Sequence, residues 1–240
     1  MIRIGRADLV APLDEAYMAA SEELDRLYAS REHEPHHTFA ELSAICDEWW
    51  ERAFDIIAQY RVSAGVFSVP FLHPDTSGLM PIRPGMIELM HGADAWRVPF
   101  IVFSAGIGDV VCACLRSYGL SFGRMEIVSN MCRFEEDGRF HGRLENSEVI
   151  HSFSKNERHL GGLDRFSLTN RSNLLLFGDS LGDAGMVSDA EGRTVIRVGI
   201  CTATNPETIE RYRQMFDVVL MPDEVDQFCR WISTLLLADQ

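Results

Sequence analysis

The sequence predicts an α/β fold with a parallel sheet, because short apolar runs of strand length alternate with helical stretches from residue 83 onward. The run 174–177 leads directly into Gly178-Asp179-Ser180-Leu181-Gly182-Asp183, which places two carboxylates just after a strand. The run 99–103 leads in the same way into Ser104-Ala105-Gly106-Ile107-Gly108. Ligands of open α/β sheets bind beyond the carboxyl ends of the strands. We therefore expect a three-layer, Rossmann-like core with its site at these two strand ends.

The N-terminal part of the chain has the pattern of helices. Apolar residues recur there at helical spacing in two stretches. They are Leu13, Tyr17, Ala20, Leu24 and Leu27 in the first stretch, and Phe39, Leu42, Ile45, Trp49, Phe54 and Ile57 in the second. Residues 62–82 are rich in proline and glycine and are expected to be a connection. The predicted division is a helical cap at 9–82 and an α/β core at 83–240, with 1–8 as a remnant of the core's N-terminal part.

The core region contains five runs with the length and composition of strands. They are 99–103, 126–128, 174–177, 195–198 and 218–221. Pro84 stands where a helix often begins, and helices are expected at 86–91 and 110–118. Asp137-Gly138 interrupts the segment 133–150, which predicts a hairpin-like excursion.

Composition excludes several classes of protein. The chain has 240 residues, and its 22 basic against 36 acidic residues give a formal net charge of −14, which argues against a nucleic-acid surface. Six cysteines occur without a Cys-x-x-Cys pair, so reduced thiols are expected. The N-terminus has no signal-peptide core, and the longest apolar run, 98–103, is too short to cross a bilayer. We expect a soluble, cytoplasmic protein, a monomer, with neither nucleic acid nor membrane as a partner.

The two carboxylates after the run 174–177 have two interpretations. Oxygen ligands on a glycine-containing turn suit Mg²⁺, which usually brings a phosphate with it. Alternatively, Asp179 or Ser180 caps a helix and Asp183 lies in its first turn, where the helix dipole favours an anion. The residues of this turn alone do not separate the two.

The segment after the run 99–103 has a similar pair of interpretations. The Ser104 hydroxyl and the Ala105 N–H could donate to a phosphate at a helix N-terminus, and Gly106 would let the backbone approach it. An ordinary strand-to-helix turn, with glycine serving geometry only, is the alternative. Lys155 gains meaning from the order along the chain, because a compact cation between the serine and the acid pair can neutralise a phosphoryl group.

This order, a serine after one strand, then a lysine, then Gly-Asp-x-x-x-Asp after a later strand, resembles the haloacid-dehalogenase superfamily. The longer strings resemble the cytosolic pyrimidine 5′-nucleotidase family. They are Ser104-Ala105-Gly106-Ile107-Gly108-Asp109-Val110, Val128-Ser129-Asn130, Val149-Ile150-His151 with Lys155 shortly after, and Gly178-Asp179-Ser180-Leu181-Gly182-Asp183. The resemblance extends from about residue 27 to the C-terminus and is strongest over 98–200. It implies a Mg²⁺-dependent hydrolase of pyrimidine nucleoside 5′-monophosphates, with such a nucleotide as its small-molecule partner.

The resemblance also implies roles for single residues. Ser104 and Ala105, with Gly106, would bind the phosphate, and Lys155 would neutralise it. Asp179 would ligate Mg²⁺ directly, and Asp183 would support the metal shell.

On the base side, the resemblance points to the cap. Glu32, before Pro35, would contact the nucleobase, whereas Ala53 stands where the family has a serine on the substrate side. The aromatic residues Trp49, Trp50 and Phe54 either form the core of the cap, which we favour, or stack on a base.

The family's chemistry begins at an Asp-x-Asp-x-Thr motif whose first aspartate is the nucleophile, and the 240 residues contain no Asp-x-Asp. Three explanations stay open: the sequence is a truncated product, the chain binds nucleotide or phosphate without turnover, or another residue is the nucleophile. A phosphatase for a different small phosphate ester, with a reshaped cap, is a further alternative.

Overall fold

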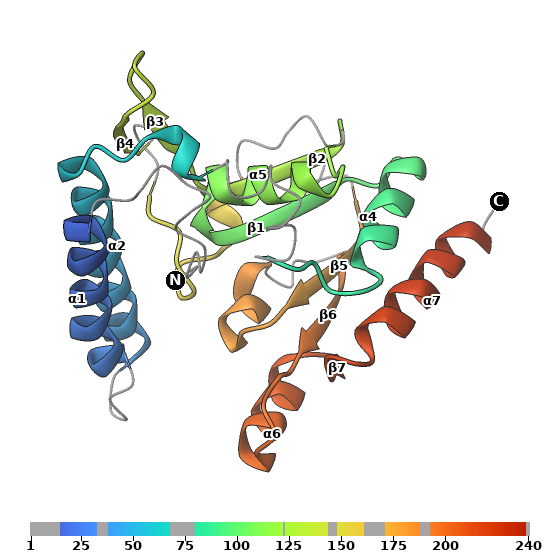
Figure 1. The fold of residues 1–240 in the computed structure, drawn as a ribbon. Helices are drawn as coiled ribbons and strands as arrows, with labels where there is room; N and C mark the ends of the chain where they lie inside the picture. The colour runs from blue at the N-terminus through green and yellow to red at the C-terminus, as the bar shows by residue number, and fades with distance from the viewer. Residues whose placement is uncertain are drawn as a thin grey trace. The chain divides into compact units, whose positions relative to one another are not determined.

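The fold is seen in a computed structural model, which describes residues 15–32, 38–67, 80–121, 123–143, 148–160, 171–187 and 193–238 (Figure 1). The chain divides into two compact units. The first unit combines Met1–Pro81 with Phe103–Gly119 and Ser129–Ser154, and the second combines Ile82–Val102 with Leu120–Val128 and Lys155–Gln240. Each unit is therefore built from three segments of the chain.

The two predicted N-terminal helices are present in the first unit as α1 (Glu15–Glu32) and α2 (Phe39–Gln59). Helix α2 begins with a capping box, in which the Glu41 carboxylate accepts from the Thr38 N–H at 2.7 Å and the Glu41 N–H donates back to the Thr38 hydroxyl at 3.3 Å. The helices pack on each other through Leu24, Tyr28 and Ile45, all buried.

Two residues of the predicted apolar stripes do not lie in the core. Leu27 is 51% exposed and Phe39 is 64% exposed. The buried face of α1 passes from Leu24 to Tyr28, four residues further on, because that step returns almost to the same side of a helix. Phe39 is the first residue of α2, and its ring contacts Phe153 edge-on at 5.5 Å instead of entering the core.

The core of the first unit forms between α2 and a hairpin of β3 (Cys132–Phe134) and β4 (Phe140–Arg143). The two strands are antiparallel, as the sequence predicts, and Gly138 supplies a positive φ of 79° in their connection. The rings of Phe54 and Phe140 stack at 6.0 Å, and Trp50 stacks on Phe54 at 5.3 Å. The aromatic residues Trp50 and Phe54 therefore belong to the core.

The segment after α2 was expected to be only a connection, and in part that expectation is wrong. Val62, Val66 and Phe67 are buried in the core of the first unit. Backbone hydrogen bonds hold this segment to the hairpin, since the Ala64 N–H donates to the Gly138 carbonyl at 2.8 Å. Burying three apolar side chains within six residues stabilises the fold, whereas leaving them exposed in a solvated linker would forgo that free energy.

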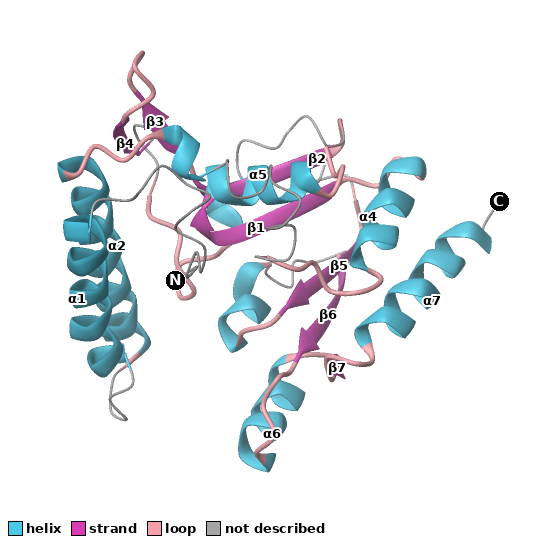
Figure 2. Cartoon of the chain, in the orientation of Figure 1, coloured by secondary structure: helices cyan, strands magenta, loops and turns pink. Residues whose placement is uncertain are grey.

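The second unit contains a parallel sheet in the order β5-β6-β7 (Figure 2). Its strands are β5 (Asn173–Gly178), β6 (Thr194–Ile200) and β7 (Val218–Leu220), and both pairings are parallel. Helix α6 (Pro206–Met215) connects β6 to β7. The parallel sheet confirms the predicted α/β class, and β5 and β6 extend slightly beyond the predicted runs.

Two further helices of the second unit, α4 (Met86–Ala95) and α7 (Val225–Ala238), pack closely together. Their contact requires Gly85, which has φ of 80°, because a Cβ atom there would lie 2.9 Å from Asp226 Cα and from Cys229 Cβ. Leu89 and Cys229 join Val198 in the buried core of this unit.

The strand that carries the serine motif is longer than the sequence predicts. Strand β1 (Phe100–Ile107) pairs with β2 (Met125–Asn130), and α5 (Gly108–Ser117) follows β1 without a turn between them. The predicted run 99–103 is therefore too short, and the alternative of an ordinary strand-to-helix turn does not describe 104–107, which are the last residues of the strand. Gly108 allows the helix to start there, because a Cβ atom would lie 2.1 Å from Met131 Sδ and 3.3 Å from Ser129 Cβ.

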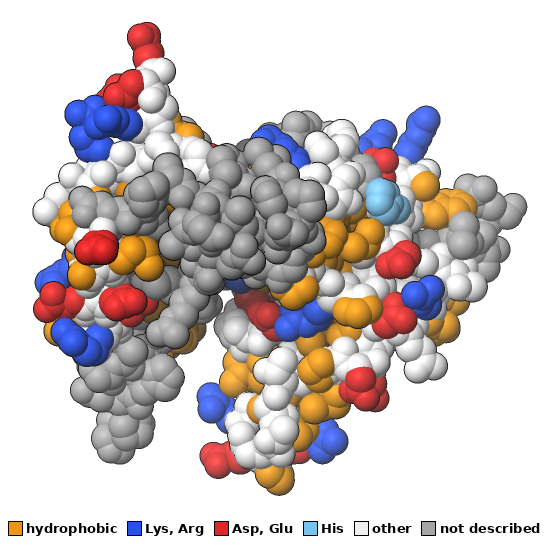
Figure 3. Space-filling model, in the orientation of Figure 1, with side chains coloured by type: hydrophobic (Ala, Val, Ile, Leu, Met, Phe, Trp, Pro, Cys, Tyr) orange, Lys and Arg blue, Asp and Glu red, His pale blue; other side chains and the backbone are white. Residues whose placement is uncertain are grey.

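Surface and membrane features can be stated for the described part of the chain. None of its helices is long and apolar enough to span a membrane. Basic and acidic side chains are interspersed over the described part of the face in Figure 3. All six cysteines are free thiols, and four of them are buried.

Candidate functional site

The acid-bearing turn follows β5 directly and is built around the Asp183 carboxylate, which is only 2% exposed. Its Oδ2 accepts hydrogen bonds from the N–H groups of Asp179 at 3.0 Å and Ser180 at 2.9 Å. Ser180 is the N-cap of the short 3-10 helix η5 (Leu181–Met186), and the two residues form a capping box. The capping interpretation therefore describes Asp183, with Ser180, one of the two predicted caps, as the N-cap.

Gly178 makes this turn possible. A Cβ atom on Gly178 would lie 2.4 Å from Asp183 Cβ, well inside van der Waals contact. The last residue of β5 must therefore lack a side chain for the buried carboxylate to fold back against it.

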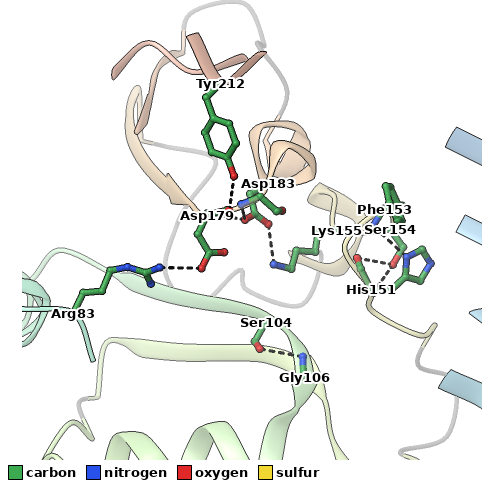
Figure 4. A network of polar contacts seen from close by, with 11 residues as sticks. Arg83, Ser104, Gly106, His151, Phe153, Ser154, Lys155, Asp179, Asp183 and Tyr212 are labelled. Carbon is green, nitrogen blue, oxygen red and sulfur yellow. Dashed lines mark hydrogen bonds and ion pairs between the residues drawn. The ribbon is translucent and has the colours of Figure 1, made fainter. Parts of the chain in front are cut away.

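Lys155 completes the surroundings of Asp183. Its Nζ lies 2.9 Å from Asp183 Oδ1, and the lysine side chain is only 12% exposed (Figure 4). Both carboxylate oxygens of Asp183 are thus engaged, one by the backbone and one by a cation. The sequence contains no other lysine, so 21 of its 22 basic residues are arginine. A compact ammonium, rather than a guanidinium, stands at this one buried position.

Asp179 is the exposed member of the pair, with 59% of its side chain accessible. Its Oδ2 lies 3.4 Å from Arg83 Nη2, while its backbone carbonyl accepts a hydrogen bond from the Tyr212 hydroxyl at 2.6 Å (Figure 4). Burial raises the pKa of the Tyr212 phenol, and the negative charges of neighbouring Asp179 and Asp183 add to the rise. Tyr212 therefore stays a donor and holds the backbone, while the Asp179 carboxylate points outward.

The donor set of this turn can be compared with what Mg²⁺ requires. The Asp179 carboxylate is a hard oxygen ligand with open coordination sites, which suits Mg²⁺. The described residues contain no group of three or more His, Cys, Asp or Glu side chains that could enclose a metal. A single carboxylate suits a cation such as Mg²⁺, which usually keeps several waters or takes oxygens of a phosphate. Asp183 is already hydrogen-bonded through both oxygens, and its role in the outer shell of a metal stays a prediction.

The serine motif forms a separate group within the first unit. The Gly106 N–H donates to Ser104 Oγ at 3.1 Å, which uses a lone pair of the hydroxyl and leaves its hydrogen to donate (Figure 4). The carbonyls of Ala105 and Gly106 are held by the side chains of Asn130, at 3.0 Å, and Ser129, at 2.8 Å. We call residues 104–106 the serine segment. The geometry suits a donor group for an anion.

The structure brings Lys155, Asp179 and Asp183 together within the second unit. The serine segment lies within the first unit, with its own hydrogen-bond partners. Glu32 is the last residue of α1, and its side chain lies outside the described part of the chain. Its predicted contact with a base therefore stays a prediction.

Sequence reasoning missed Arg83 and Tyr212, and it quoted Asn130 in the string Val128-Ser129-Asn130 without giving it a role. Arg83 and Tyr212 reach Asp179 from 96 and 33 residues away, so no local pattern marks them. Asn130 did carry a signal, since it is a polar residue at the carboxyl end of a strand.

Carboxylates at the carboxyl end of a parallel strand, on an α/β fold with a partly helical first unit, are the arrangement expected from the resemblance to the haloacid-dehalogenase superfamily. More specifically, the chain belongs to the pyrimidine 5′-nucleotidase (UMPH-1) family, whose family model matches residues 8–236. Its named relatives are 5′-nucleotidases, which are phosphoric monoester hydrolases.

Relatives of known name cover most of this chain. A 7-methylguanosine phosphate-specific 5′-nucleotidase of Gallus gallus is 29% identical over 199 residues, which is 82% of this chain and 67% of the relative. The enzyme of the same name from Drosophila melanogaster is 25% identical over 230 residues, or 93% of this chain and 69% of the relative. The chain thus spans about two-thirds of the length of these relatives.

A solved structure shares the fold. The crystal structure of cytosolic 5′-nucleotidase IIIB bound to cytidine superposes with a TM-score of 0.78. The match covers 93% of this chain and 74% of that protein, at 24% sequence identity.

Proposed function

We propose that this protein binds nucleoside 5′-monophosphates together with Mg²⁺ and hydrolyses the phosphate ester. The observation that carries the proposal is Lys155. The only lysine of an arginine-rich chain is almost buried beside Asp183, where its charge is held at the end of β5. Fixing a long side chain costs conformational entropy, and partial desolvation of its charge costs further free energy. The attraction of a bound phosphate to this ammonium would offset these costs.

Each remaining part has a role in this proposal. The Ser104 hydroxyl would donate to a phosphate oxygen, and the Lys155 ammonium would neutralise the phosphoryl charge. Asp179 would hold Mg²⁺, which when bound neutralises phosphoryl oxygens from another side. Asp183 would keep Lys155 and the backbone of Asp179 in place through its three hydrogen bonds.

Base preference is a finer part of the proposal. The family is named for pyrimidine 5′-nucleotidase, the curated relatives are named for 7-methylguanosine phosphate, and the solved relative holds cytidine. We propose a pyrimidine nucleotide as the first substrate to test. The solved relative is named cytosolic, which supports a cytoplasmic location here.

A second candidate function is nucleotide binding without turnover. It is favoured by one observation, the lack of any Asp-x-Asp in the 240 residues. A covalent nucleophile contributes most of the rate where one is used, so a chain without it would retain binding and little else.

Phosphate release and ligand binding distinguish these functions. CMP, UMP and 7-methylguanosine monophosphate are incubated with the protein and Mg²⁺, and released phosphate is measured. Release that is lost in Lys155→Met and in Lys155→Arg supports the hydrolase. Binding of CMP by calorimetry without release supports the second function. A folded protein that neither binds nor hydrolyses any of the three nucleotides contradicts both.

The single lysine permits a direct test of contact. Reductive methylation with ¹³C-formaldehyde keeps the charge of an amine and labels only Lys155 and the N-terminus. The Lys155 methyl signal should shift when CMP and Mg²⁺ are added. A signal that stays unchanged at saturating CMP contradicts the proposed role of Lys155.

A further inference from the structure

Asn130 lies at the end of β2 and is 4% exposed, so each of its polar atoms needs a partner. Its Nδ2 donates to the Ala105 carbonyl at 3.0 Å and to the Ile150 carbonyl at 2.8 Å. Its Oδ1 accepts from the Ile150 N–H at 2.8 Å. One buried amide thus bridges the serine segment and the segment that leads to Lys155.

The orientation of this amide is determined by its surroundings. The Ile150 N–H can only donate, so it requires the oxygen of Asn130 on its side, and the two carbonyls require the nitrogen on theirs. A flipped amide would oppose donor to donor and acceptor to acceptor. Aspartate has nearly the same size and shape as asparagine, but an ionised carboxylate offers no donor beside its acceptors.

Beyond Ile150, the chain is held as a compact turn before it reaches Lys155. The Ser154 hydroxyl donates to the Val149 carbonyl at 3.0 Å and accepts from the His151 N–H at 2.9 Å. The His151 ring is 3% exposed; its Nδ1 accepts from the Phe153 N–H at 3.2 Å, and its Nε2 lies 3.2 Å from the Asp47 carboxylate on α2. We call residues 149–154 the lysine-bearing segment, because Lys155 follows it directly.

We infer that Asn130 is a positioning residue that holds the serine segment and the lysine-bearing segment in one fixed register. It touches no substrate, and it acts by fixing the backbone that presents Ser104 and the backbone that delivers Lys155. The inference rests on the proposed function for its meaning, because only an anion that uses both groups benefits from their register. Its structural content, a coupling of two segments by one side chain, is testable without any ligand.

Ser129 provides a contrast within the same strand end. Its hydroxyl donates to the Gly106 carbonyl at 2.8 Å, so it supports the serine segment. Ser129→Ala should therefore loosen 103–108 and leave 149–154 unchanged. Asn130→Asp keeps the acceptor for the Ile150 N–H but places a carboxylate oxygen against two carbonyls, and it should loosen both segments.

The test is hydrogen exchange of the full chain, followed by mass spectrometry, for the wild type and three variants. Asn130→Asp should raise the exchange rate of the amide hydrogens in 103–108 and in 149–154 by about tenfold or more. This is the effect expected when buried groups lose hydrogen bonds between neutral partners. Strand β6, residues 194–200, makes none of these contacts, so it serves as an internal reference and should not change. Asn173→Asp, the same substitution at an exposed position of β5, is the matched control and should change neither segment.

Three results would overturn the inference. They are a response of only one segment to Asn130→Asp, an equal rise in 194–200 that signals general destabilisation, and a response of both segments to Ser129→Ala. If Asn130→Asp does not fold, Asn130→Ser, which retains one donor and one acceptor in a smaller side chain, takes its place with the same expected pattern.

Calorimetric titration with CMP separates this inference from the proposed function. Asn130→Asp should weaken CMP binding by about tenfold or more, while Asn173→Asp should bind as the wild type does. A wild-type protein that does not bind CMP contradicts the proposed function, and the exchange pattern still decides the role of Asn130. Unchanged CMP affinity in Asn130→Asp, in a wild type that binds, overturns the inference.

Discussion

Replacing Asp183 by asparagine removes one negative charge from the centre of the acid-bearing turn without changing its size. The carboxylate accepts three hydrogen bonds, two from the backbone of Asp179 and Ser180 and one from Lys155. It is almost completely buried, and the lysine side chain is 12% exposed. The substitution therefore acts on a pair that solvent screens weakly.

The magnitude follows from what an amide can replace. If the asparagine oxygen keeps the two backbone N–H groups, its NH₂ group faces Lys155 Nζ, two donors across a distance that was 2.9 Å. The hydrogen bond between charged partners is lost, which costs about 1.5–3 kcal/mol. Removing one partner of a buried ion pair costs about 3–5 kcal/mol in full burial. Because Lys155 retains some exposure, we expect the free energy of unfolding to fall by about 3 kcal/mol.

Removing the lysine of this ion pair should lower the free energy of unfolding by less than removing the aspartate charge. In Lys155→Met, the Asp183 carboxylate keeps both backbone N–H donors, so its charge stays partly compensated. We expect a loss of about 1–2 kcal/mol. The two variants are thus unequal, although they break the same ion pair.

The assay is urea unfolding followed by circular dichroism. With a slope of about 2–3 kcal/mol per molar urea, Asp183→Asn should lower the midpoint by about 1 M or more. Asp226→Asn is the control, because it breaks the exposed pair with Arg230 within α7 and should hardly move the midpoint. A midpoint for Asp183→Asn close to that of Asp226→Asn, or a larger effect of Lys155→Met, would refute the reasoning.

Three further predictions concern the same turn. Gly178→Ala should destabilise the protein by about 1–3 kcal/mol, seen in thermal unfolding, because its Cβ would lie 2.4 Å from Asp183 Cβ; wild-type stability would contradict the close approach. The folded-state pKa of Tyr212 is raised, so the unfolded chain releases the phenolic proton first; this contribution to stability is complete below about pH 10 and is lost as the pH rises through the folded pKa. Urea midpoints from about pH 8 to about pH 11 should therefore fall more steeply for the wild type than for Tyr212→Phe, and parallel curves would argue against it. Arg83→Ala should bind Mg²⁺ more tightly in calorimetry, because it removes a positive group 3.4 Å from Asp179 Oδ2; unchanged or weaker binding would show that Arg83 does not compete with the cation.

Local patterns predicted the elements well and their burial less well. The strand runs and the hairpin at Gly138 were found, because alternation, length and turn residues are properties of a few neighbouring positions. Leu27 and Phe39 were assigned to buried stripes and are exposed. Helical spacing predicts that a helix has an apolar face. Which side chains at the edge of that face become buried depends on the element that packs against the helix.

The site shows the same division. The capping interpretation describes Asp183, which completes the capping box, whereas Asp179 is the exposed carboxylate and its role as a Mg²⁺ ligand stays a prediction. The sequence could not assign them, because the assignment depends on which carboxylate receives the backbone N–H groups and the Lys155 ammonium. Likewise, the serine segment was expected to follow the strand run 99–103 and is instead the end of β1, where side chains from β2 hydrogen-bond to it.

The sequence by itself determined the α/β class, the family, the two strand ends that carry polar groups, and the order of serine, lysine and paired acids. These follow from periodicity and from short motifs, which neighbouring residues define. The tertiary structure decided which acid is buried and which is exposed, that Arg83 and Tyr212 flank Asp179, and that Asn130 bridges two segments 45 residues apart from Ala105 to Ile150. Those properties depend on hydrogen-bond partners that are far apart in the sequence, and only the folded backbone brings such partners within hydrogen-bonding distance of one another.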